Sequence, residues 1–91
     1  MTFLRPNLIR NRKKGFSVEL LGRTGLEYRE GDRSMFVDSE LQPDSIAVFR
    51  NSIKAWNPPH DCEPIDEKSR DRILENIKLA FESKGDCVDL L

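Results

Sequence analysis

The hydrophobic pattern of the chain changes once, at a proline-rich connector that spans residues 52–66. Before the connector, apolar residues alternate as they do in β-strands. After it, they recur with the 3.6-residue period of an α-helix. Pro58 and Pro59 fix φ, remove two backbone donors and keep the residue before each of them extended. Trp56 can bury a large apolar surface at the same point. Strands followed by a helix predict an α+β domain.

Four strand patterns precede the connector. Phe16, Val18 and Leu20 alternate with their neighbours, and Gly22 and Gly25 can take the positive φ of a hairpin turn after them. A short continuous apolar run begins at Ile46, and because it is too brief for a helix we expect it to be the central strand. Residues 39–45 are expected to form a loop. The expected strands are residues 16–21, 26–30, 34–38 and 46–49.

The segment after the connector predicts one amphipathic helix of about five turns. Asp66 is a suitable N-cap, and Gly85 can take the left-handed conformation that ends a helix. Residues 87–91 resume a strand pattern. We therefore expect a small antiparallel sheet of four to six strands, one long C-terminal helix packed on one face, and a short terminal strand. The apolar stripe of the helix holds Ile73, Leu74, Ile77, Ala80 and Phe81.

Charge is divided unevenly along the chain. Residues 1–18 carry five basic side chains and no acidic one, whereas the remaining 73 residues carry ten basic and sixteen acidic side chains, a net charge of −6. Residues 1–15 have no sustained period, so we expect a basic, partly ordered leader before a single domain of residues 16–91. Clustered basic residues can neutralise phosphates. Few aromatic residues accompany them, however, and the acidic body would repel nucleic acid, so a solvated segment is favoured.

Composition also bears on location and cysteine chemistry. No apolar run approaches the roughly 20 residues of a membrane-spanning helix, and the N-terminus lacks the apolar core of a secretory signal. We therefore expect a cytoplasmic protein, with no membrane partner. In that compartment Cys62 and Cys87 are expected to remain reduced thiols.

One cluster could support catalysis or metal binding. His60, Asp61, Cys62 and Glu63 are adjacent, and a thiol beside an imidazole can be activated. Four neighbours in one loop cannot all point inward, and zinc sites usually draw on two separated ligand pairs. The chain contains no second histidine. We therefore expect no catalytic residue, no cofactor and no metal, and keep a metal- or thiol-dependent enzyme that uses His60 and Cys62 as the less favoured alternative.

Several motifs together resemble a known family. They are the S-I-K-x-W-x-P-P-H run of residues 52–60, the E-P-I of residues 63–65, the R-I-x-x-N-I of residues 72–77, and the G-D-R-S-M-x-V-D-S-E of residues 31–40. Over roughly residues 16–91 the chain is similar to immunity protein family 74 of bacterial polymorphic-toxin systems. The resemblance implies a non-enzymatic protein that binds a cognate toxin domain and blocks it.

This resemblance assigns provisional roles to residues. An acidic body suits a basic toxin, for example a nuclease, because opposite fields accelerate encounter. The alternative is a structural module without a toxin partner, which could form a homodimer through a sheet edge. The residues expected to be structural are Trp56, Pro58, Pro59, Ile65, Ile73 and Ile77. The candidate contacts with the toxin are Asp44, Asp61, Glu63 and Glu75.

Overall fold

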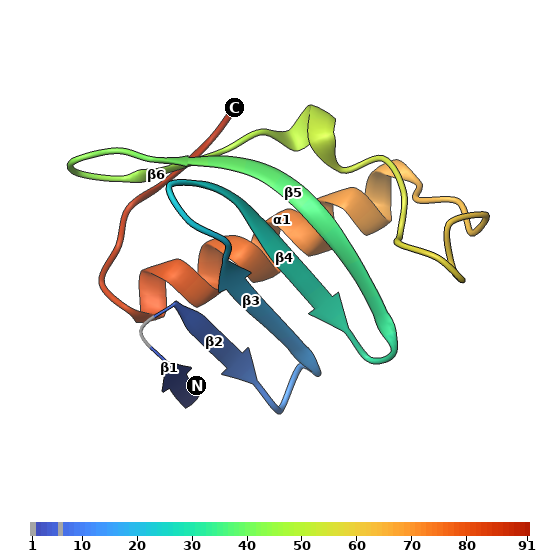
Figure 1. The fold of residues 1–91 in the computed structure, drawn as a ribbon, viewed down its shortest axis with the longest axis horizontal. Helices are drawn as coiled ribbons and strands as arrows, with labels where there is room; N and C mark the ends of the chain where they lie inside the picture. Colours follow the sequence, from blue (N-terminus) through green and yellow to red (C-terminus); the bar gives the residue numbers. More distant parts are fainter. Residues whose placement is uncertain (1, 6) are drawn as a thin grey trace.

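The computed structural model describes residues 2–5 and 7–91, with the backbone alone for residues 2–5. In these residues a curled seven-stranded sheet lies against one long helix (Figure 1). The strands are adjacent in chain order: β1 (Thr2–Arg5), β2 (Leu8–Asn11), β3 (Phe16–Leu20), β4 (Thr24–Glu30), β5 (Arg33–Leu41), β6 (Ile46–Val48) and β7 (Val88–Leu90). A short 3₁₀ helix, η1 (Arg50–Ser52), precedes the connector, and α1 spans Glu67–Ser83. The expected α+β fold is confirmed.

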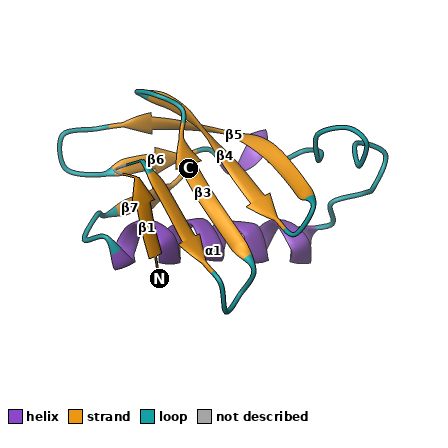
Figure 2. Ribbon diagram, turned by 60° about the horizontal axis from the view of Figure 1, so that its bottom comes forward, coloured by secondary structure: helices purple, strands orange, loops and turns teal. Residues whose placement is uncertain are grey.

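Alternation along the strands divides the sheet into two faces. Ile9, Val18, Tyr28 and Met35 pair in one row across β2 to β5, and all four are buried beneath α1. The helix runs along this side only (Figure 2). It contributes its own apolar stripe to the core, with Ile73, Leu74, Ile77, Ala80 and Phe81 all buried. The opposite side of the sheet, which faces the reader in Figure 1, is not covered by the helix.

Two strands lie in the segment where the sequence indicates none. β2 pairs with β3 along its whole length, and the Ile9 side chain of β2 is 2% exposed. The alternation is short here because β2 has only four residues, of which Ile9 alone is buried. Such a pattern gives little periodic signal. Met1 and Pro6, which belong to the expected leader, lie outside the described residues.

The second half of the sheet corrects two expectations. β5 continues to Leu41, so residues 39–41 are strand and not loop. β6 is not central, because it lies between β5 and β7, and β4 holds the middle position. All three residues of β6 are buried nonetheless. The continuous apolar run of residues 46–48 therefore indicates that both faces of β6 are buried. It does not indicate that the strand is central in the sheet.

The ends of α1 form as the sequence predicts. The carboxylate of Asp66 accepts a 2.7 Å hydrogen bond from the Ser69 N–H, which stabilises the first turn. Gly85 follows the helix with φ +95°, a conformation that disfavours residues with a Cβ. The chain then returns to the sheet, where β7 pairs parallel to β6. β7 is the expected short terminal strand, and its pairing is parallel because the helical crossover lets the chain re-enter in the same direction. No helix in the described part of the chain is both long and apolar enough to cross a membrane.

Candidate partner-binding surface

The connector is held to the sheet by its own polar groups. Ser52 Oγ accepts a 2.8 Å hydrogen bond from the Asp38 N–H of β5. The Asn57 N–H donates to the Ser34 carbonyl at 2.7 Å, and its side chain donates to Ser34 Oγ at 3.1 Å. Between these two points Trp56 is buried, with its ring centroid 6.4 Å from that of Tyr28. The Trp56 side chain therefore closes the core where the connector runs along β5.

A charged cluster joins the end of the connector to the β4–β5 turn. Glu63 accepts a 2.8 Å hydrogen bond from Arg33 Nε, and its second oxygen lies 2.6 Å from His60 Nδ1. The other His60 nitrogen lies 3.5 Å from Asp32 Oδ2. The hydrogen bonds from Arg33 and His60 lower the pKa of Glu63. This arrangement uses both carboxylate oxygens of Glu63 and both ring nitrogens of His60 to fix the connector in place.

A second polar network lies between the sheet and the helix. The buried Asn76 of α1 donates a 2.9 Å hydrogen bond to the Tyr28 hydroxyl, which donates in turn to Glu30 at 2.6 Å. Arg72 completes the network with two hydrogen bonds to the Glu30 carboxylate. Burial, followed by the hydrogen bond to Glu30, raises the pKa of Tyr28 far above its usual value. The sequence signal that could have identified this network is a polar residue, Asn76, inside the apolar stripe of the helix.

The uncovered side of the sheet, called here the open face, carries an acidic region with an aromatic residue within it. Phe36 of β5 is 54% exposed and pairs with Glu27 of β4. Its ring covers Gly25, since a Cβ added there would come within 2.5 Å of Phe36 Cε2. Five carboxylates occupy outward positions of this face: Glu19, Glu27, Asp38, Glu40 and Asp89.

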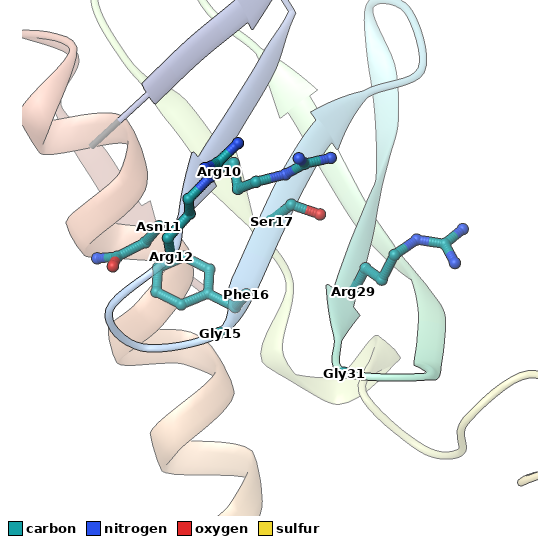
Figure 3. Close-up of a pocket in the computed structure, with 8 residues that line it drawn as sticks. All are labelled: Arg10, Asn11, Arg12, Gly15, Phe16, Ser17, Arg29 and Gly31. Carbon is teal, nitrogen blue, oxygen red and sulfur yellow. The ribbon is translucent and has the colours of Figure 1, made fainter.

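A basic hollow borders the acidic region, across β2 to β4. It is an open hollow of about 380 Å³, and Arg10, Arg12 and Arg29 contribute to its lining. Arg10, Ser17 and Arg29 project from one side of the strands, whereas the ring of Phe16 lies on the other side, toward the helix (Figure 3). Arg29 forms an ion pair with Glu27 at 2.8 Å. The two halves of the open face thus carry opposite charge and meet at this pair.

The four acidic residues that the sequence nominates as contacts do not form one patch. Asp44 lies in the β5–β6 loop, and Asp61 and Glu63 lie in the connector; these two segments are at opposite ends of the molecule (Figure 1). Glu75 is exposed on α1. Glu63 is engaged within the charged cluster described above. Both cysteines are exposed, and in the described residues no group of three or more potential ligands is arranged for a metal ion.

The residues expected to be structural divide by exposure. Trp56, Ile73 and Ile77 are buried, and Ile65 packs partly buried against the core. Pro58 and Pro59 are exposed in the turn of the connector, with a cis bond between them. Trp56 and Ile65 therefore hold the connector against the core, whereas Ile73 and Ile77 belong to the buried stripe of α1.

Comparison with known families agrees with the motif. The profile of the immunity protein 74 family matches residues 17–90 of the chain. This chain belongs to the immunity protein 74 family. No curated protein and no solved structure matches it significantly. In this member of the family, four residues of the connector motif contact the rest of the scaffold through the hydrogen bonds, ion pairs and ring contacts described above. They are Ser52, Trp56, Asn57 and His60.

Proposed function

We propose that this immunity protein binds a cognate toxin domain and blocks it by occupancy, without a catalytic step of its own. The family match over residues 17–90 is the observation that carries the proposal. Under this proposal the protein acts in the cytoplasm of a bacterium that makes or receives the toxin, and its partner is a protein and not a nucleic acid or a membrane.

Two features of the molecule support binding as the mechanism. The sheet, the helix and the connector are joined by buried contacts and by two polar networks, which gives a rigid scaffold. Rigid scaffolds present preformed surfaces, so less conformational entropy is lost on association. Residues 19–91 carry a net charge of −6, which favours a basic toxin. Complementary charge accelerates encounter and disfavours other partners.

The environment of His60 supports a non-enzymatic role. Its two ring nitrogens face Glu63 and Asp32 within the cluster that holds the connector. A general base must reach the proton that it removes from a substrate. An imidazole engaged on both sides by carboxylates of its own protein is better suited to positioning the connector than to proton transfer with a ligand.

Co-expression tests this proposal. The probe is the toxin domain encoded in the adjacent reading frame, expressed with and without the immunity protein in a sensitive bacterial host. We expect growth arrest by the toxin alone and normal growth with both, together with a complex that co-elutes in size-exclusion chromatography. Rescue without a complex, or rescue that is lost in Cys62→Ala while binding persists, would contradict the mechanism. A homodimer that excludes the toxin would favour the structural-module alternative.

Charge reversal identifies the acidic residues that take part. Asp44, Asp61, Glu63 and Glu75 remain candidate contacts, and each is changed singly to lysine. Reversal at a true contact among Asp44, Asp61 and Glu75 should reduce protection while the melting temperature stays unchanged. Reversal of Glu63 should also lower the melting temperature, because it removes the hydrogen bonds with Arg33 and His60. Reversal of Arg12 or Lys13 to glutamate should leave protection intact, since a basic toxin would not contact the basic segment.

A further inference from the structure

We propose that the toxin docks on the acidic half of the open face, with Phe36 at the centre of the contact, and that the toxin surface is cationic. This inference rests on the proposed function, because it names the surface and the chemistry of the same interaction. Three observations lead to it. They are the exposure and fixed position of Phe36, the acidic residues around it, and the mixed charge of the outer surface of α1.

Phe36 is held in place although it is exposed. In the described part of the chain it is the one aromatic side chain with more than half of its surface accessible. Its ring lies over Gly25, where φ is +84° and the register of β4 and β5 shifts. Contact with the glycine backbone restricts the ring, so little side-chain freedom is lost when a partner covers it. Aromatic residues, phenylalanine among them, are enriched at protein interfaces, and the few residues that dominate binding lie near the interface centre.

The charge around Phe36 defines the partner. Glu27 pairs directly with Phe36, and Asp38 and Glu40 follow it at the outward positions of β5. Asp38 and Glu40 are exposed, and no side-chain partner is present for either among the described residues. Unpaired carboxylates beside an aromatic ring suit a surface of lysine and arginine, whose charged groups pair with the carboxylates. Such cations also bind favourably over a ring face.

The outer surface of α1 lacks this combination. Its exposed side chains alternate in sign, as in Lys68, Asp71, Arg72 and Glu75, which is typical of a solvated helix. None of its exposed residues is aromatic. The basic half of the open face, around Arg10 and Arg29, would repel a cationic partner. The acidic half of the open face is therefore the surface with both an apolar centre and a charge of one sign.

Three variants test the docking surface, with the toxin domain of the adjacent reading frame as the probe and isothermal titration calorimetry for Kd. Phe36→Ala removes the central ring and should weaken binding by about 30-fold or more, the size of a hot-spot loss. The pair Asp38→Lys and Glu40→Lys should slow association by about tenfold at low salt, with the difference shrinking as salt rises. The matched control is the pair Asp71→Lys and Glu82→Lys, both exposed on α1, which changes net charge equally and should leave Kd within about twofold.

Thermal unfolding of each variant separates binding from folding. All three variants should retain cooperative unfolding, and the two charge variants test the surface even if Phe36→Ala is destabilised by uncovering Gly25. Wild-type affinity in both open-face variants, or a loss confined to the α1 pair, would overturn this inference while leaving the proposed function intact. Absence of binding by the wild-type protein would instead contradict the proposed function itself.

Discussion

Replacing Trp56 with alanine should lower the free energy of unfolding by about 3–5 kcal/mol. Trp56 is 6% exposed and packs on Tyr28 beside the connector. A buried aromatic side chain of this kind hides about 150–250 Å². At about 25 cal/mol per Å², that area corresponds to about 4–6 kcal/mol. The remaining alanine and partial collapse of the site reduce the expected loss to the range measured for buried tryptophan.

Urea unfolding followed by far-UV circular dichroism measures this loss, because the substitution removes the tryptophan fluorescence signal. Leu91→Ala is the control: that side chain is 60% exposed, so its truncation should change stability by about 0.5 kcal/mol or less. A native spectrum with a loss below about 1 kcal/mol for Trp56→Ala would refute the argument. It would mean that the tryptophan does not close the core, and it would make Trp56 a candidate for toxin contact.

Three further predictions follow from the polar groups. Asn76→Ala should cost about 1–3 kcal/mol in urea unfolding, because it removes a buried donor to Tyr28, whereas the exposed neighbour Glu75→Ala should cost about 0.5 kcal/mol or less. Hydrogen bonds from Ser69 lower the pKa of Asp66, so the free energy of unfolding should fall as pH decreases below about 4. Asp66→Asn should reduce this dependence of stability on pH. The purified protein should contain no stoichiometric zinc and two titratable thiols, and His60→Ala should not change either measurement.

Each of these has a contrary result. Equal stability of Asn76→Ala and wild type would show that the buried network contributes nothing net. The sign of the pH effect follows from linkage: the folded state binds fewer protons at Asp66 than the unfolded state, so acid favours unfolding. A variant with the same acid profile as wild type would contradict that assignment. Zinc at one equivalent that disappears in His60→Ala would revive the metalloenzyme alternative.

The sequence predicted those elements whose pattern is long or whose boundary chemistry is specific. The helix was predicted with its Asp66 cap and the Gly85 termination, because 17 residues give several turns of periodic signal. β2 was missed because a four-residue strand with one buried side chain gives almost no periodic signal. The position of β6 was wrong because local apolar character reports burial and not the order of strands in a sheet.

The surface was less predictable than the fold. Acidic residues can be counted in a sequence, but their grouping depends on register. Glu19, Glu27 and Phe36 belong to different strands and share a face only because β3, β4 and β5 pair as they do. The fixed position of Phe36 depends on its contact with Gly25, eleven residues earlier in the chain. Neither relation appears in a local pattern. The acidic half of the open face therefore emerged only from the structure.

Inhibition of the toxin by titration tests the central claim most directly. The activity of the purified toxin domain from the adjacent reading frame is measured while the immunity protein is added in steps. Blocking by occupancy predicts that activity falls in proportion to the protein added, reaches zero at a fixed molar ratio, and does not depend on incubation time. Substoichiometric inactivation that progresses with time would identify an enzyme, and full toxin activity at saturating protein would exclude binding as the means of protection.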